Sequence, residues 1–480
     1  MSSARMTDIR AVGAGLLGGV VITAMASQFS EMGTRYLVFG VVGGLVGTLL
    51  MSLPNRRRVL LGVTLVSLQL DASIFFDYVG KHRSTGWSGP PGVMLPISFL
   101  PAMVLLTYLW VTQGRAGRRI EFGGEAGRAG LAVTGAAIVS IGVSSWPFLS
   151  TCYALQMVQL LTVYLAITNA VTDRRDHELA LRVLQVVVFT QATVYFVESA
   201  VGHTFAVTGD AFEAADGRHG GTVGVSPADF TSFMMPLVLL VAAQVVTVKG
   251  RAPRPAVVLT GMGLVAILCT YTRASWAGTA FGVVAIVLLA ARRGLLNRRY
   301  VMVLGMLAVV GLAIAFPKMA LRLANNAADS EERKGLMLVA IEVIKGNPIL
   351  GVGGGMYALV FRDYVPYALS KNWLFVVHNT YLLQWAEMGL PGILALIALL
   401  GIAVRDAWRL AHSDDRQMAV YGIGWFGGLI ALLWEMYWDV WRGFTYNAML
   451  WALIGLAAAA GRIERERRCG VEARSGGVAC

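Results

Sequence analysis

The chain has 480 residues, of which 56% are hydrophobic and only 14% are charged, and its mean hydropathy is +0.64. These values exclude a soluble globular protein of this length and indicate a polytopic membrane protein. The net charge of +12 does not by itself indicate a nucleic-acid partner, and we expect none, because in a membrane protein the position of each Lys and Arg carries the information.

Apolar runs with the length that a helix needs to cross a bilayer recur along the whole chain. Since backbone groups inside the membrane must be hydrogen-bonded within their own segment, we expect an all-α integral membrane protein. The sequence predicts about fourteen spans, at residues 11–29, 36–53, 59–76, 93–112, 130–148, 151–171, 183–201, 228–247, 257–272, 275–291, 300–316, 380–404, 418–437 and 446–460.

Arginine clusters occur in every second loop, for example at residues 56–58, 174–175, 292–293 and 298–299. The positive-inside rule therefore predicts that both termini lie in the cytoplasm. Residues 24–26, Ala-Met-Ala, resemble a signal-peptide cleavage site. Cleavage there would leave about thirteen spans and would not change the side on which the later loops lie.

Metal chemistry finds little support in the sequence. The loop 202–227 holds His203, His219 and three carboxylates, so it is either a solvated loop or an acceptor or metal site, but it lacks HxH and HxxxH spacing. The four cysteines have neither metal nor thioredoxin spacing. We expect no metal and no cofactor.

Arg273 stands between the spans 257–272 and 275–291, which leave almost no room for a loop. The predicted topology holds its guanidinium at the extracytoplasmic interface. An arginine at a helix end often extends its head to water without any further function, but a single cation in so tight a hairpin is equally suited to an anionic substrate.

The large extracytoplasmic loop 317–378 contains an amphipathic stretch, from Glu331 to Lys345, that is predicted to form a helix at the membrane surface. Its apolar face contains Leu336, Met337, Ala340, Ile341, Val343 and Ile344, with Arg333 on the same side. A glycine run at 351–355 follows, and it permits tight or left-handed backbone unless it is a plain connector. Arg362 and Lys371 are further cations of this loop.

His378 lies where this polar loop meets the span 380–404, with Asn379 or Thr380 as the expected N-cap and Glu387 further along the helix. A histidine at a membrane interface is commonly structural. Here it follows directly on a loop with several arginines. An external enzyme has no access to cytoplasmic nucleotide sugars, so it needs an activated donor that arrives through the membrane, such as a lipid diphosphate. Arginine binds diphosphate through two hydrogen bonds, and histidine accepts a proton near neutral pH.

Two motifs resemble those of the bacterial O-antigen ligase and polymerase superfamily. Residues 346–353 read GNPILGVG, which is similar to its N/H-P-L-x-G-x-G element, and residues 378–392 read HNTYLLQWAEMGLPG, which is similar to its HNxYL and E-x-G-x-x-G element. The resemblance covers roughly residues 255–400. This family comprises membrane glycosyltransferases of the GT-C-like type, usually with about twelve spans.

The resemblance implies a role for each matching residue. His378 matches the histidine that activates the acceptor hydroxyl, Arg333 the arginine that holds the diphosphate, and Arg273 a second family arginine. By position we add Arg362. The motif residues Asn379, Glu387, Gly351 and Gly353 are further expected members of the substrate-binding site.

The family further implies a metal-independent, inverting transferase in the bacterial inner membrane. It would move a glycan from undecaprenyl diphosphate to a lipid A core sugar, as a ligase, or to another lipid-linked glycan, as a polymerase. A lipid-linked oligosaccharide flippase is the alternative of another class, but it should show related halves and mid-membrane charges. We expect N-terminal spans in 1–254, a catalytic region in 255–405, C-terminal spans in 406–461 and a disordered cytoplasmic tail in 462–480.

Overall fold

A computed structural model describes residues 53, 55–76, 92–117, 119–204, 219–224, 226–324, 326–365 and 376–474. Several predictions concern residues outside these ranges and stay predictions. They are the spans 11–29 and 36–53, the possible cleavage site at 24–26, Lys371 and the three carboxylates of the loop 202–227.

The described chain is mainly helical, and eight of its helices are long and apolar enough to cross a membrane. This confirms a helical, multi-pass membrane protein. The longer helices are α3 (Arg56–Ser67), α4 (Phe99–Arg115), α5 (Gly124–Ser140), α6 (Pro147–Ala170), α7 (Arg174–Val201), α8 (Pro227–Val246), α9 (Arg254–Cys269), α10 (Arg273–Arg292), α11 (Arg298–Ala324), α12 (Asn326–Gly346), α14 (Thr380–Ala411), α15 (Arg416–Trp438) and α16 (Phe444–Arg474).

Short elements connect them. Two 3₁₀ turns, η2 (Ile141–Val143) and η3 (Phe361–Tyr364), and the single-turn helix α13 (Tyr357–Val360) lie near the ends of the longer helices. Two strands, β1 (Ser73–Phe76) and β2 (Val93–Pro96), pair antiparallel with Ser73 opposite Pro96.

The strands and the last helix differ from the sequence prediction. The run 59–76 was expected to be one helix, but α3 ends at Ser67 and residues 73–76 form the strand β1. Ile74, Phe75 and Phe76 suit a strand as well as a helix. In the opposite sense, α16 continues to Arg474, through the tail that was predicted to be disordered. Pairs of Glu464 with arginines three and four residues later stabilise this extension.

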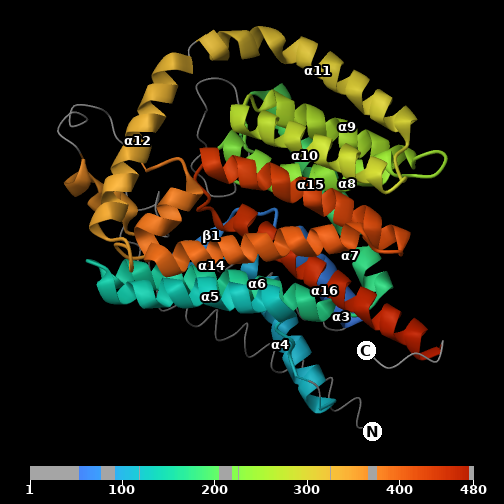
Figure 1. The fold of residues 1–480 in the computed structure, drawn as a ribbon, viewed down its shortest axis with the longest axis horizontal. Helices are drawn as coiled ribbons and strands as arrows, with labels where there is room; N and C mark the ends of the chain where they lie inside the picture. Colours follow the sequence, from blue (N-terminus) through green and yellow to red (C-terminus); the bar gives the residue numbers. More distant parts are fainter. Residues whose placement is uncertain are drawn as a thin grey trace.

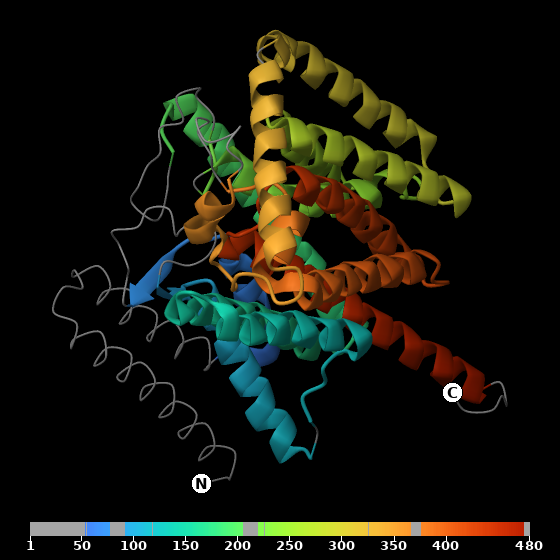
Figure 2. The same ribbon diagram turned by 60° about the vertical axis from the view of Figure 1, so that its left-hand side comes forward.

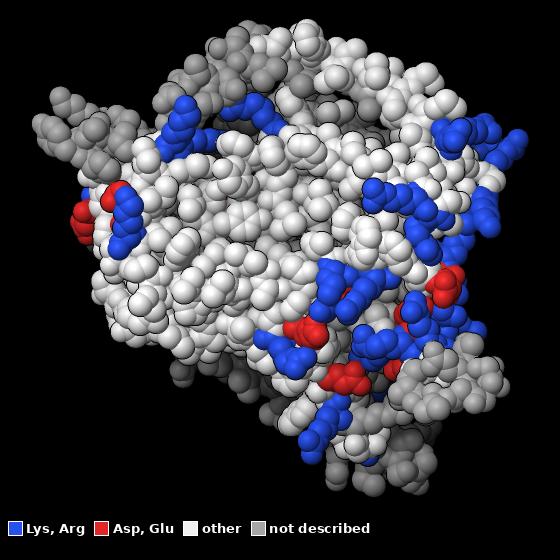
Figure 3. Space-filling view, in the orientation of Figure 1, with Lys and Arg blue, Asp and Glu red and all other residues white. Residues whose placement is uncertain are grey.

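Four long helices lie side by side in the order α5, α14, α15 and α10 (Figure 1), with α14 in contact with both α5 and α15. The helices α8, α6 and α16 pack against them and complete the core. The helices α11 and α12 form an arch over α9, α10 and α15 in both ribbon views (Figures 1 and 2). Figure 3 shows a hollow beneath this arch, with Lys and Arg side chains beside it.

The predicted amphipathic stretch lies within α12. Leu336, Ala340, Val343 and Ile344 of its predicted apolar face are buried, whereas Ile341 is 37% exposed. The helix contacts α14 and η3, and Ala340, Val343 and Ile344 belong to one buried apolar cluster with residues of α13, η3 and α14. Protein therefore covers the apolar face of this helix, which holds α12 and its arginine at a fixed position relative to α14.

Most of the basic side chains visible in Figure 3 gather at one end of the bundle, over the ends of α7, α14 and α16, and a broad uncharged surface separates them from the opposite end. Asp176 anchors two arginines at this arginine-rich end. Its fully buried carboxylate accepts hydrogen bonds from Arg57 and Arg58 at 2.6 Å each and from the backbone N–H of Thr172 at 3.1 Å. This contact joins α3 to α7.

Asp176→Asn should lower the free energy of unfolding by about 1.5–3 kcal/mol, because it removes charge-assisted hydrogen bonds from a buried group. Thermal melting of the purified protein measures the loss. Asp173→Asn is the matched control, since Asp173 pairs with the same Arg58 but is 48% exposed, and it should cost less than about 1 kcal/mol. Equal losses in the two variants would show that Asp176 is not the anchor.

Candidate active site

The helix α14 is interrupted at Gly389, and the glycine run docks against this break. Gly389 has φ 62° and ψ −162°, which are not helical values. Consequently the carbonyls of Ala386 and Glu387 face away from the helix ladder and accept the N–H groups of Val352 and Gly353, at 2.9 Å each. The two motifs, which are separated by the 24 residues 354–377, thus form one backbone unit.

Glycine is required at two positions of the glycine run that forms this contact. Gly351 has φ 71°, and a Cβ there would lie 2.4 Å from the carbonyl carbon of Glu387. Gly353 has φ 106°, and its Cβ would lie 2.7 Å from the Ser144 side chain. Only a residue without a side chain permits this backbone conformation and this approach.

The side chain of Glu387 holds the same region from inside. It is fully buried, and it accepts hydrogen bonds from the backbone N–H groups of Gly355 at 3.0 Å and Tyr357 at 3.2 Å. It also forms an ion pair with Arg442, whose guanidinium lies 4.8 Å from the centre of the Tyr153 ring. One carboxylate therefore ties α14, the glycine run and the loop between α15 and α16 together.

That loop, residues 439–443, is further fixed by the start of α14. Asn379, one of the two predicted candidates, is the N-cap, and its side chain accepts the N–H of Leu382 at 2.9 Å. The hydroxyl of Thr380 donates to the carbonyl of Asp439 at 2.8 Å and accepts the N–H of Trp441 at 3.0 Å. The loop therefore lies directly against the residues that follow His378.

Asp439 is a carboxylate that the sequence reasoning missed, and the hydrogen bond from Thr380 to its carbonyl places it beside the segment that begins at His378. Burial raises the pKa of the Asp439 carboxyl above its ordinary value, and the positive charges of His378 and Arg333 act against that rise. Arg333 also donates to the carbonyl of Trp438 at 3.4 Å. The alternation of spans places residues 438–445 at the same end as His378, which is the signal that could have pointed to Asp439.

Arg273 is the first residue of α10, directly after the tight turn that was predicted. The turn includes Tyr271 with φ 53°, a left-handed conformation that a bulky residue seldom adopts. Two residues later the hydroxyl of Ser275 donates to Glu435 of α15 at 2.6 Å. Since Glu435 lies one turn before Asp439, Arg273 and Asp439 belong to the same end of the bundle.

Arg362 lies on η3 with an exposed side chain, and η3 contacts α12. In the loop 202–227, His219 is buried. Its ring nitrogen Nδ1 lies 3.1 Å from the hydroxyl oxygen of Thr204. Among the described residues, no group of three or more His, Cys, Asp or Glu side chains has the arrangement to hold a metal ion.

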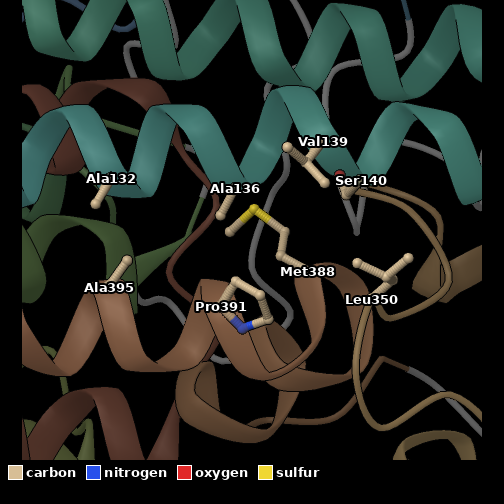
Figure 4. A pocket seen from close by; sticks show the side chains of 8 residues that line it. All are labelled: Ala132, Ala136, Val139, Ser140, Leu350, Met388, Pro391 and Ala395. Atoms are coloured by element: carbon tan, nitrogen blue, oxygen red, sulfur yellow. The ribbon is translucent and has the colours of Figure 1, made fainter.

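An apolar pocket of about 240 Å³ lies between α5 and α14, beside the glycine contact. Figure 4 shows Met388, Pro391 and Ala395 of α14 facing Ala136 of α5 across it. The hydroxyl of Ser140 is its polar group, and that hydroxyl accepts the N–H of Gly354 at 3.0 Å. The pocket contains no charged side chain and is not suited to a diphosphate.

Comparison with known families gives one match: residues 256–397 match a family model described as O-antigen ligase. No curated protein matches the chain. The matched segment contains the two motifs and the residues Arg273, Arg333 and His378, and it ends before Asp439. The match confirms the resemblance that the motifs indicated.

Glu387→Gln should lower the free energy of unfolding by about 3–5 kcal/mol, because Arg442 would remain charged and buried without its counter-ion. Glu342→Gln is the matched control. Glu342 pairs with Lys345 on the surface of α12, where the side chains are 41% and 65% exposed, so its loss should cost less than about 1 kcal/mol. Thermal melting that shows similar shifts for the two variants would contradict this role of Glu387.

Proposed function

We propose that the chain is a membrane glycosyltransferase, and the match of residues 256–397 to the O-antigen ligase family model supports this proposal. It would transfer a glycan from undecaprenyl diphosphate to a sugar hydroxyl at the periplasmic face of the inner membrane. With a lipid A core sugar as acceptor it is an O-antigen ligase, the assignment that we favour. With another lipid-linked glycan as acceptor it is a polymerase of the same superfamily.

The observation that supports the proposal is that Thr380, two residues after His378, and Arg333 donate hydrogen bonds to the neighbouring carbonyls of Asp439 and Trp438. The positive-inside rule assigns the arginine-rich end and both termini to the cytoplasm. It therefore assigns His378 to the opposite, periplasmic side, where a lipid-linked donor is the available activated sugar.

In the proposed reaction the acceptor hydroxyl attacks the anomeric carbon of the donor sugar. The new C–O bond forms as the bond to the diphosphate breaks, so a single displacement inverts that carbon. The imidazole of His378 takes the hydroxyl proton, and the Asp439 carboxylate stabilises the imidazolium that results. The guanidinium of Arg333 binds the diphosphate and neutralises its growing charge, with Arg273 as a second phosphate ligand. Because the arginines supply the positive charge that neutralises the diphosphate, the proposed reaction needs no metal.

The other predicted site residues receive supporting roles in this proposal. Arg362, exposed on η3, is placed to meet the charged part of a substrate. Asn379 begins the helix next to His378, and Glu387, Gly351 and Gly353 shape the wall of the site through the backbone contacts described above. A flippase is the rival, and an assay for transfer without nucleotide or metal separates the two functions.

His378→Ala should slow transfer from a lipid-linked glycan by about 10²- to 10⁴-fold, because the general base is lost. The measurement uses purified full-length protein, donor and acceptor, without nucleotide or metal. His412→Ala is the control, since His412 is exposed at the other end of α14, and it should leave the rate unchanged. Transfer that survives His378→Ala at the original rate would rule out the proposed base.

Arg333→Lys should lower the transfer rate by at least about tenfold even though the positive charge is kept, because lysine cannot make the two parallel hydrogen bonds of a guanidinium. Arg299→Lys, an exposed position at the arginine-rich end, is the matched control and should be neutral. Full activity of Arg333→Lys would mean that the diphosphate is bound elsewhere.

A further inference from the structure

Three aromatic rings connect the outer surface of the bundle to the proposed site. The ring of Phe281 on α10 lies 4.9 Å from that of Trp434 on α15, and Trp434 lies 5.9 Å from Trp438. Phe281 is 46% exposed, and the two tryptophans are partly exposed. We call these three side chains the aromatic ladder.

Trp438, at one end of the ladder, lies next to Arg333 and Asp439. The carbonyl of Trp438 accepts a hydrogen bond from Arg333, and the next residue is Asp439. The helices α10 and α15, which carry the ladder, lie beneath the arch of α11 and α12 (Figure 1), and Figure 3 shows the hollow under that arch. The three rings therefore lead from the carbonyl that Arg333 contacts to the exposed face of α10.

In the predicted topology, Phe281, at the other end of the ladder, lies within the hydrocarbon layer of the membrane. Phe281 follows Arg273 by eight residues, which is about 12 Å along a helix, in a hydrocarbon layer about 30 Å thick. Val284 and Leu288 continue the same face of α10 and are 54% and 56% exposed. An apolar chain attached to a phosphate at Arg333 would thus pass over aromatic rings first and aliphatic side chains next.

We propose that the aromatic ladder binds the first isoprene units of the donor's polyprenyl chain. This inference rests on the proposed function and names the part of the chain that recognises the lipid. Isoprene units are flat, unsaturated and methyl-branched, so they can lie against the faces of aromatic rings, which offer large, rigid apolar surfaces. A diphosphate held by Arg333 would place those units next to Trp438 and then Trp434.

Exposed aromatic side chains elsewhere provide the comparison. Trp110 on α4 and Phe189 on α7 are 67% and 50% exposed and belong to helices that carry no proposed site residue. They represent aromatic rings that simply face bulk lipid. The apolar pocket between α5 and α14 (Figure 4) is the other place where a lipid chain could lie.

The test compares two donors that share one glycan diphosphate, one with an undecaprenyl chain and one with a methyl group in its place, with the full-length protein in lipid nanodiscs. Phe281→Ala and Trp434→Leu should each raise the KM for the undecaprenyl donor relative to the methyl donor by roughly three- to tenfold. Trp110→Leu and Phe189→Ala should leave this ratio unchanged. Phe281→Leu, which keeps most of the side-chain bulk, guards against a folding defect and should give a smaller effect.

An unchanged ratio in the ladder variants, or an equal change in the controls, would overturn the proposal. A photoreactive undecaprenyl diphosphate analogue provides a second readout that needs no turnover. Crosslinks to α10 and α15 support the ladder, whereas crosslinks to α5 and α14 or an even distribution overturn it. Failure of the unmodified protein to transfer from either donor would instead refute the proposed function.

Discussion

The buried carboxylate of Glu387 is the interaction on which the arrangement of the site depends. Removing a carboxylate and a guanidinium from water costs several kcal/mol for each ion, and the cost is offset only when the pair is close and its remaining hydrogen bonds are satisfied. Here Arg442 and the two backbone N–H groups of Gly355 and Tyr357 meet that condition. The carboxylate, the two N–H groups and the guanidinium come from three segments, so these contacts fix three pieces of backbone at once.

The position of Asp439 follows from that constraint. The loop that begins with Asp439 contains Arg442, and the hydroxyl of Thr380 ties its first residues to the start of α14. On the other side, the buried face of α12 packs on α14 and sets the position of Arg333. An imidazole, a guanidinium and a carboxylate that are 45 and 61 residues apart in the sequence thus lie at the same end of the bundle because one helix, α14, organises all three segments.

Much of this could be read from the sequence, because it depends on local patterns. The apolar helices, the tight turn before Arg273 and the glycine motif follow from periodicity and backbone geometry, and capping left Asn379 and Thr380 as the N-cap candidates. The match of residues 256–397 supports the resemblance to the O-antigen ligase family. The predicted amphipathic stretch likewise lies within one helix, although protein rather than solvent or lipid covers most of its apolar face.

The remainder depends on contacts between distant segments. Nothing local distinguishes Asp439 or Arg442 from ordinary charges at the end of a span, and the buried partner of Arg442 lies 55 residues away. The β1 segment was read as helix because Ile and Phe are compatible with either structure, and the pairing with β2 decides between them. From the sequence, Phe281 and Trp434 are indistinguishable from lipid-facing residues. Only the fold shows that their rings adjoin Trp438, whose carbonyl contacts Arg333.

The central claim is that His378 and Asp439 act as one unit, and a double-mutant cycle on single-turnover transfer tests it most directly. His378→Ala, Asp439→Asn and the double variant are compared with the unmodified protein. If the carboxylate acts through the imidazole, the double variant should be no slower than His378→Ala alone, because the effects of coupled residues are not additive. Rate losses that multiply would show that the two residues act independently and would contradict the account.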